Sequence, residues 1–255
     1  ANKDSHFSYG SCGAMTDLAS KGAPIKSIGV IDAMGTEAIL VRPDSGVKRI
    51  KDLKGKKILT TANAGVNTFF PIVLANAGLK ESDVNITNVP DGALVSSYLQ
   101  GSGGAVAILG GLDDKPAEIK ANGGDQPIAF PYSDYGVNQV GYCIATHNDT
   151  IKNNPGLAKR FIRATMEAYA KAEKNPNAAV DAIADIVGGS MAEEAGRKQS
   201  REVLDVTLGI LYSGANKDKV LGLNVPADWN SMVKLMKEYN DLDKNSKASD
   251  FYTNQ

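Results

Sequence analysis

Polar, glycine-bearing turns follow several predicted strands, and they hold the residue types best suited to binding a ligand. The most informative of them, residues 61–68, leads from a strand into a helix and contains Asn63, Gly65, Asn67 and Thr68. Backbone N–H groups at a helix N-terminus have no intrahelical partner and carry partial positive charge, so this turn can hold an anionic or strongly accepting group. Because the lysine and the spacing of a phosphate-binding P-loop are absent, the alternative is an ordinary turn capped by Asn or Thr.

A similar turn, Gly-Ser-Cys-Gly at residues 10–13, follows the first predicted strand and precedes a helix. Its Ser11 and Cys12 either cap that helix or contact a ligand. Neither of the two histidines in the chain stands in a context that would activate Ser or Cys as a nucleophile. The sequence therefore predicts no catalytic residue.

Carboxylates and aromatic rings follow two further predicted strands. Gly111 and Asp113 come after an apolar strand, where aspartates either cap a helix or also face a ligand. Tyr132, Asp134 and Tyr135 come after the next strand. Two rings beside a carboxylate suit a planar or cationic ligand, and interdomain packing is the alternative.

The cysteine and histidine content argues against metal chemistry. Cys12 and Cys143 lie far apart without Cys-x-x-Cys spacing, which excludes a zinc knuckle and leaves one disulfide or two free thiols open. His6 and His147 are the only histidines, and the motif His-Glu-x-x-His is absent. We therefore expect neither a metal site nor a cofactor, and we expect His147 to lie at a helix cap.

The composition excludes several classes of function. In 255 residues, Lys and Arg number 28 and Asp and Glu 29, which gives a net charge of −1 and no attraction for nucleic acid or anionic lipid. The longest apolar candidate for a membrane span, residues 28–41, is interrupted by Asp32, Thr36 and Glu37. The first residues lack the basic and apolar regions of a signal peptide, which predicts that any export signal has already been removed.

These turns are positioned by alternating β-type runs and helical patterns. Over residues 7–88 the alternation is typical of βα units and a mainly parallel sheet, and residues 44–135 form an α/β part of their own. Residues 137–146 predict a long strand. The glycines at 101–104 precede a strand and so indicate a tight turn, not a nucleotide loop. Beyond the long strand the pattern predicts helices around 155–169, 178–187, 191–211 and 227–239.

Several short motifs occur in the order of one protein family: GAPIK at 22–26, DLKGKKI at 52–58, the turn at 60–68, NAGL at 76–79, DYGV at 134–137, NP at 154–155 with FIRAT at 161–165, and FYTN at 251–254. Over nearly all of its length the chain resembles the substrate-binding proteins of ABC importers in the NMT1/THI5-like group, which serve nitrate, sulfonates, taurine and pyrimidine precursors of thiamine. The resemblance implies an α/β chain with the type II periplasmic-binding-protein fold. In that fold two α/β lobes are joined by two crossing strands, and the C-terminal part is helical.

The resemblance also implies how the chain is divided. Lobe one would comprise residues 1–43 plus 137–255, and lobe two residues 44–136, with the ligand held in the cleft where the four turns meet. Members of the family begin with a strand-helix-strand unit ahead of the point that matches Ala1. We therefore expect lobe one to lack that unit in this sequence.

The function implied by the resemblance is that of a monomeric periplasmic or extracytoplasmic protein, not an enzyme. It would capture a small-molecule solute and deliver it to the membrane permease of an ABC importer. The rings of Tyr132 and Tyr135 favour a planar heterocycle such as a thiamine pyrimidine precursor, and a sulfonate, nitrate or taurine-type anion is the alternative. A THI5-type pyrimidine-precursor synthase is disfavoured because the sequence lacks a cysteine cluster, and a sensory ligand-binding module of a receptor is a further possibility.

Overall fold

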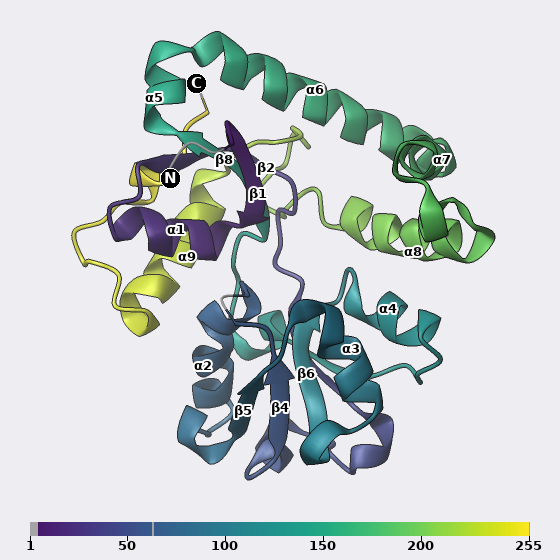
Figure 1. Ribbon diagram of the computed structural model, residues 1–255. Coiled ribbons are helices and arrows are strands. Elements are labelled where there is room, and N and C mark those ends of the chain that lie inside the picture. The colour runs from purple at the N-terminus through teal and green to yellow at the C-terminus, as the bar shows by residue number, and fades with distance from the viewer. Residues whose placement is uncertain (1–4, 63, 255) are drawn as a thin grey trace. The chain divides into compact units, whose positions relative to one another are not determined.

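The computed structural model describes residues 5–62 and 64–254 of the chain (Figure 1). They form two compact units, each assembled from separate stretches of sequence. Unit 1 consists of Ala1–Gly35, Asn138–Ile186 and Thr207–Gln255, and unit 2 of Thr36–Val137 and Val187–Val206. Within the described residues each unit contains one β-sheet.

The sheet of unit 1 has the strand order β1-β8-β2 (Figure 1). Strands β1 (Phe7–Ser11) and β2 (Ile25–Val30) both pair antiparallel with β8 (Tyr142–His147), so they run in the same direction on either side of it. Helix α1 (Cys12–Ser20) connects β1 to β2, as a connection between two strands of the same direction requires. The carboxyl ends of β1 and β2 therefore lie where β8 begins, at Tyr142.

The long helix α6 (Pro155–Lys174) covers part of the unit 1 sheet. Its Ile162 packs in a cluster with the buried Ile144 of β8. The ring of Phe161 on the same helix stacks on Phe7 of β1, with the two ring centroids 4.0 Å apart. The apolar residues at helical spacing therefore form the buried face of the helix, as expected.

Two predicted helix caps are confirmed. The side chain of Asn154 accepts a hydrogen bond from the N–H of Leu157 at 3.3 Å, and Pro155 occupies the first helical position of α6. Nδ1 of His147 accepts from the N–H of Asp149 at 3.0 Å and caps α5 (Asn148–Asn153), the helix that precedes α6. The other helices after β8 are α7 (Pro176–Val187), α8 (Glu194–Gly209) and α9 (Pro226–Tyr239).

The sheet of unit 2 has the strand order β5-β4-β6-β3-β7. Its strands are β3 (Glu37–Val41), β4 (Lys57–Thr60), β5 (Asn85–Asn88), β6 (Ala105–Gly111) and β7 (Ile128–Pro131). Strand β4 pairs parallel with β5 and β6, whereas β3 pairs antiparallel with β6 and β7. Helices α2 (Val66–Asn76), α3 (Asp91–Leu99) and α4 (Lys115–Ala121) follow β4, β5 and β6 in turn. The carboxyl ends of β4, β6 and β7 thus lie at the edge where β3 begins.

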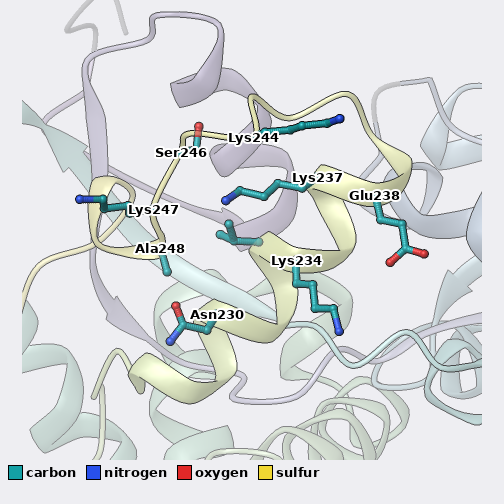
Figure 2. Close-up of a pocket in the computed structure, with 9 residues that line it drawn as sticks. Asn230, Lys234, Lys237, Glu238, Lys244, Ser246, Lys247 and Ala248 are labelled. Carbon is teal, nitrogen blue, oxygen red and sulfur yellow. The ribbon is translucent and has the colours of Figure 1, made fainter.

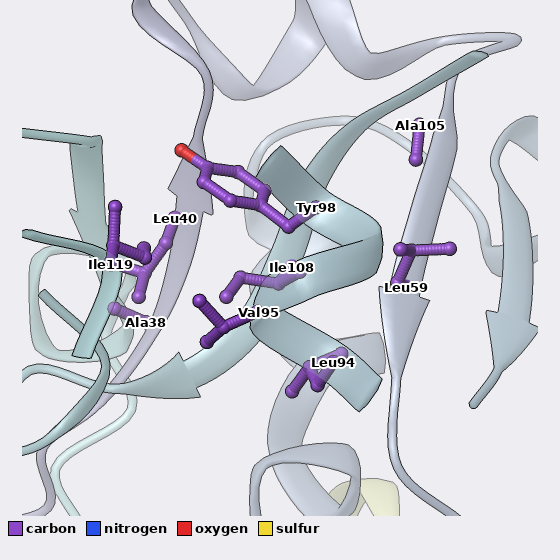
Figure 3. Close-up of a cluster of buried hydrophobic side chains, with 9 residues drawn as sticks. All are labelled: Ala38, Leu40, Leu59, Leu94, Val95, Tyr98, Ala105, Ile108 and Ile119. Atoms are coloured by element: carbon purple, nitrogen blue, oxygen red, sulfur yellow. The ribbon is translucent and has the colours of Figure 1, made fainter. Parts of the chain in front are cut away.

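A cluster of nine buried side chains joins α3 and α4 to the unit 2 sheet (Figure 3). Leu94, Val95 and Tyr98 of α3 pack against Ile108 of β6 and Leu40 of β3. All of these residues are at most 3% exposed. The apolar residues that predicted strand and helix in this part of the chain therefore form one continuous core.

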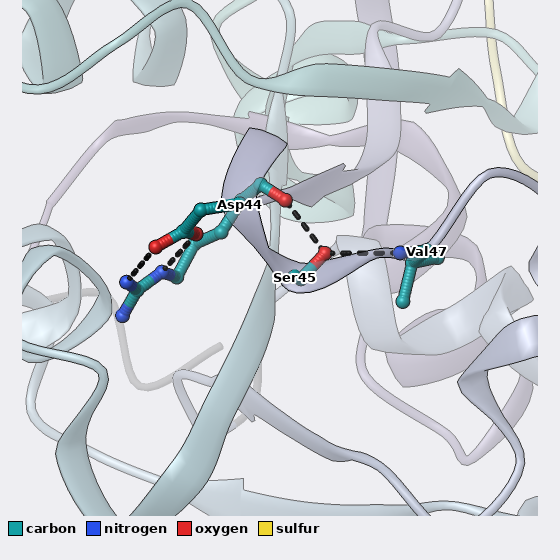
Figure 4. Close-up of polar contacts among 4 residues, drawn as sticks. Asp44, Ser45 and Val47 are labelled. Carbon is teal, nitrogen blue, oxygen red and sulfur yellow. Dashed lines mark hydrogen bonds and ion pairs between the residues drawn. The ribbon is translucent and has the colours of Figure 1, made fainter.

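Strand β3 ends in a turn that is held by polar contacts (Figure 4). Nε and Nη2 of Arg42 donate to the carboxylate of Asp44 at 3.0 and 2.6 Å. The Ser45 hydroxyl donates to the carbonyl of Arg42 at 2.6 Å and accepts from the N–H of Val47 at 3.3 Å. Gly46 has a φ of 75°, a conformation that a residue with a Cβ rarely adopts. The motif Pro-Asp-Ser-Gly thus ends the strand as its residue types predict.

Short 3-10 helices also occur, at Pro43–Ser45, Ile50–Leu53, Glu81–Asp83, Ser102–Gly104, Tyr132–Tyr135, Gly189–Ala192 and Ala248–Asp250. The one at Ser102–Gly104 confirms the interpretation of the glycine run as a tight turn between a helix and a strand. Gly101, Gly103 and Gly104 all have positive φ there.

Two predictions from the sequence are wrong in detail. The sheets are not mainly parallel, because β3 and β8 run against both of their neighbours. The strand predicted at 137–146 begins only at Tyr142. Residues 137–141 bond instead to the turn after β2: the N–H of Gly35 donates to the carbonyl of Gln139 at 3.1 Å, and that of Gly141 to the carbonyl of Asp32 at 3.0 Å.

Candidate functional site

Asp32 lies at the centre of a polar and aromatic cluster at the carboxyl end of the unit 1 sheet. It follows β2, and its N–H donates to the carbonyl of Tyr142 at 3.2 Å, which places it at the start of β8. The residue is 1% exposed, and its carboxylate accepts a hydrogen bond from the Tyr9 hydroxyl at 3.4 Å. A buried carboxylate at the end of a strand is a candidate for ligand binding. Burying a charged group costs free energy, so buried charges are concentrated at functional sites.

Three tyrosines are associated with this carboxylate. The rings of Tyr9 and Tyr142 stack, with centroids 5.2 Å apart and an interplanar angle of 24°. Tyr9 is 57% exposed, so its ring is accessible for contact with a solute. Burial raises the pKa of Tyr169 on α6 to about 12, and the negative charge of Asp32 adds to this increase. The cluster thus combines a buried acceptor with an exposed aromatic surface.

Ser11 and Cys12 lie at the same edge of the sheet, between β1 and α1. Oγ of Ser11 accepts from the N–H of Ala14 at 3.4 Å, so Ser11 acts as a helix cap. The N–H of Cys12 donates to the carbonyl of Gly141 at 2.8 Å. Both residues are buried, and Cys12 forms no disulfide with the equally buried Cys143. Capping is therefore confirmed, and contact of these two residues with a ligand stays a prediction.

Gln139 is a further candidate in unit 1. It is 6% exposed, and neither atom of its side-chain amide has a hydrogen-bond partner within the part of the chain that the structure describes. Its backbone lies beside the turn after β2 through the bond from Gly35. Leaving a buried amide unpaired costs free energy, and a solute with both donors and acceptors would satisfy it.

In unit 2, Asn67 organises the turn between β4 and α2. Its Oδ1 accepts from the hydroxyl of Thr60 at 2.7 Å, and its Nδ2 donates to the carbonyl of Thr61 at 2.8 Å. The N–H groups of Asn67 and Thr68 donate to the carbonyls of Ala64 and Gly65 at 3.0 and 3.1 Å. These two donors of the helix N-terminus are therefore already engaged within the turn.

The other residues expected to bind ligand in this turn are placed as follows. Gly65 is the N-cap residue of α2, and Thr68 is half-buried in its first turn. Asn63 lies outside the described residues. The hydroxyl of Thr61 is buried and has no hydrogen-bond partner among the described residues, so it joins the candidates.

Gly111 and Asp113 lie at the carboxyl end of β6. Oδ1 of Asp113 accepts from the hydroxyl of Thr36 at 2.5 Å. A Cβ on Gly111 would overlap with the same carboxylate oxygen, so glycine leaves the room that this bond needs. The next carboxylate, Asp114, occupies the N-cap position of α4. Asp113 is thus held at the sheet edge while its neighbour starts the helix.

Tyr132 lies in the interior of unit 2 at the end of β7. It is 2% exposed, and its hydroxyl donates to the carbonyl of Val66 at 3.1 Å. Its ring stacks on that of Phe70, with centroids 6.5 Å apart. Burial raises its pKa well above the ordinary range, and the charge of Glu37, the first residue of β3, adds to this increase. These contacts of Tyr132 all lie within unit 2, so they are not interdomain packing, and stacking on a ligand stays a prediction.

Asp134 and Tyr135 follow in a short 3-10 helix. Asp134 is exposed and Tyr135 half-buried. The carbonyl of Tyr135 accepts from Nδ2 of Asn76 at 2.7 Å, which joins this turn to the end of α2. Burial raises the pKa of Tyr135, and the charge of Asp134 adds to it. Contact of either side chain with a ligand stays a prediction.

The loops at the carboxyl ends of the strands are acidic in both units. They contain a single cation, Lys115, in the segments 10–13, 31–37, 61–68, 110–115 and 131–142. Nζ of Lys115 lies 2.9 Å from Glu118, 3.4 Å from Asp114 and 3.8 Å from Asp91. Burial acts to lower the pKa of Lys115, but these carboxylates outweigh it and the pKa is raised. The lysine is therefore neutralised locally.

Comparison with known proteins identifies the family of this chain. Residues 1–179 match the family described as NMT1/THI5 like. The chain belongs to the NMT1/THI5-like family. Among curated proteins it is similar to a Haemophilus influenzae protein named for thiamine biosynthesis, with 26% identity over 164 residues that cover 64% of this chain and 51% of the relative. The chain thus spans about half the length of the curated relative that it matches.

Solved structures with the same fold include periplasmic binding proteins. The alkanesulfonate-binding protein SsuA from Xanthomonas axonopodis pv. citri, bound to MOPS, is 16% identical with a TM-score of 0.70, over 97% of this chain and 80% of that one. The nitrate-binding protein NrtA from Synechocystis PCC 6803 is 12% identical with a TM-score of 0.62, over 96% and 71%. A protein from Bordetella bronchiseptica RB50 is 22% identical with a TM-score of 0.72, over 99% and 79%. The fold expected from the resemblance is therefore confirmed.

In the described residues, no three His, Cys, Asp or Glu side chains are grouped so that they could hold a metal ion. Across the same residues, no helix combines the length and the apolar character needed to cross a bilayer.

Sequence reasoning missed several of the candidate residues in this family member. Asp32 and Glu37 are in the sequence as polar interruptions of an apolar stretch, and both turn out to be buried at strand ends. Their position directly after or at the start of a β-type run was the signal that could have identified them. No comparable signal marks Gln139, because its burial depends on the turn after β2.

Proposed function

We propose that this chain is an extracytoplasmic solute-binding protein that captures a small planar heterocycle rich in hydrogen-bond donors, of the thiamine-pyrimidine type, and delivers it to the permease of an ABC importer. Membership of the NMT1/THI5-like family and the fold of periplasmic binding proteins support the binding function. The observation that carries the ligand class is the buried carboxylate of Asp32 beside the stacked rings of Tyr9 and Tyr142.

The chemistry of this cluster suits an aminopyrimidine. A carboxylate accepts hydrogen bonds from amino and ring N–H groups, and bonds to a charged acceptor are about twice as strong as neutral ones. The exposed ring of Tyr9 offers a flat surface on which a heterocycle can stack. Gln139 supplies one donor and one acceptor that lack partners among the described residues. Together these groups match a flat solute with polar edges.

The same cluster disfavours a simple anion. Nitrate or a sulfonate needs cationic or N–H donors, and it is repelled by nearby carboxylates. The strand-end loops provide Lys115 as their single cation, and three carboxylates already surround it. The relative from Haemophilus influenzae is named for thiamine biosynthesis, which supports a thiamine-related solute over a sulfonate.

Binding without turnover is the expected behaviour of the protein. Ser11 and Cys12 are engaged as cap and backbone donor, and Nδ1 of His147 is engaged as the cap of α5. We therefore place no catalytic step on these residues. A binding protein needs only a preference of the solute for one conformation of the chain.

The test is isothermal titration calorimetry of the purified chain with a 4-aminopyrimidine, taurine, methanesulfonate and nitrate in parallel. We expect stoichiometric binding of the aminopyrimidine, no binding of nitrate, and recovery of the unchanged ligand by chromatography after overnight incubation. Binding of nitrate or the sulfonate alone would contradict the ligand class. Chemical conversion of a bound ligand, or formation of a pyrimidine from pyridoxal phosphate and iron, would contradict the binding function itself.

A further inference from the structure

A basic groove lies in unit 1 between helix α9 and the segment that follows it, residues 244–248 (Figure 2). Its volume is about 470 Å³. None of the residues that line it belongs to the strand-end clusters described above. Four lysines line it together with one glutamate and four smaller residues: Lys234, Lys237, Lys244, Lys247, Glu238, Asn230, Val233, Ser246 and Ala248.

The spacing on α9 explains how one helix supplies most of this groove. Positions 230, 233, 234, 237 and 238 recur every three or four residues and therefore share one face of the helix. From Asn230 to Lys237 this face is about 10 Å long, at about 1.5 Å of rise per residue. Val233 and Ala248 are 4% and 6% exposed and give the groove an apolar base below the lysines.

The ion pairs that the structure describes do not involve the lysines of the groove. Among the described residues, Lys234, Lys237, Lys244 and Lys247 form no ion pair within 4.0 Å. Two acids near this segment accept hydrogen bonds from backbone N–H groups of turns. Asp243 accepts from the N–H of Asn245 at 2.9 Å, and Asp250 from the N–H of Lys247 at 2.7 Å.

This local charge stands out against the chain as a whole. The net charge of the protein is −1, whereas the side chains that line the groove carry four positive charges and one negative charge. Like charges that are gathered on one face repel each other, and a bound anion relieves that repulsion. The groove therefore attracts a polyanionic partner although the overall field of the protein does not.

We propose that this groove binds a short acidic segment of a partner protein, with two or more carboxylates on the lysines and one apolar side chain on Val233 and Ala248. The recessed apolar base favours a protruding segment over a flat bilayer surface, which would meet the rims only. Lysines act as separate point charges on flexible stems, so they can pair with carboxylates that are spaced along an extended segment. This interaction is independent of the solute proposed above.

The test uses a fluorescein-labelled peptide, Glu-Glu-Leu-Glu-Glu with blocked ends, and fluorescence anisotropy with the intact chain at low salt. The test variant carries Lys234→Gln, Lys237→Gln, Lys244→Gln and Lys247→Gln. The matched control removes the same charge from α5 and α6 by Lys152→Gln, Lys159→Gln, Lys171→Gln and Lys174→Gln. Glutamine keeps the helix propensity of lysine, so both variants should fold, and thermal melting verifies this.

We expect the wild-type chain and the control to bind the peptide with equal affinity, and the groove variant to bind at least about tenfold more weakly. Added salt should weaken wild-type binding, because the contacts are exposed. Equal loss in both variants, equal binding of a Gln-Gln-Leu-Gln-Gln peptide, or no binding to the wild type would overturn the proposal. Binding to vesicles of phosphatidylglycerol that is lost only in the groove variant, without peptide binding, would assign the groove to a membrane surface instead.

Discussion

The hydroxyl of Tyr9 donates to the buried carboxylate of Asp32 at 3.4 Å, although Tyr9 lies in β1 and Asp32 follows β2, on the other side of β8. The length of this bond leaves it weak compared with an ideal O–H···O bond of about 2.7 Å. A solute donor that approaches Asp32 can therefore compete with Tyr9 at low cost. The bond thus links the carboxylate of Asp32, which would accept from the solute, to the ring of Tyr9, which would stack on it.

Asp32→Asn tests this arrangement directly. Loss of a hydrogen bond to a charged group costs about 1.5–3 kcal/mol, so we expect the affinity for an aminopyrimidine to fall tenfold or more in calorimetry. The pKa of Tyr169 should also fall, because the charge of Asp32 contributes to its increase. A spectroscopic titration of tyrosinate measures that change. Asp17→Asn, at an exposed pair with Lys21, is the control and should alter neither quantity.

Asn67→Ala should destabilise unit 2, because Asn67 holds the turn after β4 through two side-chain bonds. Removing both leaves the Thr60 hydroxyl and the Thr61 carbonyl without those partners and should cost about 1–3 kcal/mol. Urea unfolding measures this change in the free energy of unfolding. Asn67→Asp keeps the acceptor for Thr60 and loses the donor to Thr61, so it should lie between the wild type and the alanine variant. Equal stability of all three would show that the turn does not depend on this side chain.

Tyr98 should make the protein sensitive to alkaline pH. Burial raises its pKa to about 12, above the ordinary value of about 10. The folded state therefore favours the protonated phenol, and this contribution is complete below about pH 10 and is lost as the pH rises through about 12. Tyr98→Phe should reduce the loss of stability over this range.

At neutral pH the same substitution should be harmless or stabilising. The Tyr98 hydroxyl is buried and has no hydrogen-bond partner in the described part of the chain, while its ring packs in the cluster of Figure 3. Phenylalanine keeps the ring and removes the unpaired group, whose burial costs about 1–3 kcal/mol. Denaturant unfolding at pH 7 and pH 11 separates the two effects. A large loss of stability at pH 7 would contradict this account of the hydroxyl.

Asn224→Ala should loosen the C-terminal segment from unit 1. Asn224 is fully buried, accepts from the Ser27 hydroxyl at 2.7 Å and donates to the carbonyl of Thr253 at 3.1 Å. We expect a loss of about 2–4 kcal/mol in thermal or urea unfolding. Asn254→Ala keeps the bonds to Ser27 and Thr253 and removes only those to Asn254, so its effect should be smaller, about 1 kcal/mol.

The sequence predicts the helix caps and turns of this fold well, but it predicts the directions of the strands poorly. The caps at Asn154 and His147 and the glycine turn at Ser102–Gly104 depend on neighbouring residues, so residue type and spacing predict them. The direction of β3 and β8 depends on strands that lie far away in the chain. Their apolar runs are compatible with either direction, and only the pairing decides it.

In the candidate site, too, features that depend on neighbouring residues are predictable, and features that depend on distant residues are not. Asp113 and Asn67 could be chosen from their places after predicted strands, and both lie at the expected sheet edge. The position of Tyr132 after a predicted strand leaves ligand stacking and interdomain packing open, and in the structure its hydroxyl donates to the carbonyl of Val66, 66 positions away in the chain. Such a partner cannot be read from local spacing, and neither can the burial of Gln139.

Gly111→Ala tests whether Asp113 contacts the solute. The added Cβ would overlap with Oδ1 of Asp113 and lie 3.2 Å from the Thr36 hydroxyl. A carboxylate end can rotate away, so we expect a folded protein with a displaced Asp113 and a loss of stability of about 1–2 kcal/mol from the broken bond. Thr36→Val removes the same bond without the added bulk and should leave Asp113 closer to its place.

If Asp113 binds the solute, Gly111→Ala should weaken the affinity for an aminopyrimidine about tenfold, and Thr36→Val by less. Gly92→Ala, where a Cβ would meet nothing within 4 Å, should leave the affinity unchanged, and as a helical position it should not reduce stability. Calorimetry on the three variants and the wild type measures these differences. Unchanged affinity in Gly111→Ala would show that Asp113 does not contact the solute and only bonds to Thr36 at the sheet edge. The variant displaces the carboxylate of Asp113 whether or not a solute is present.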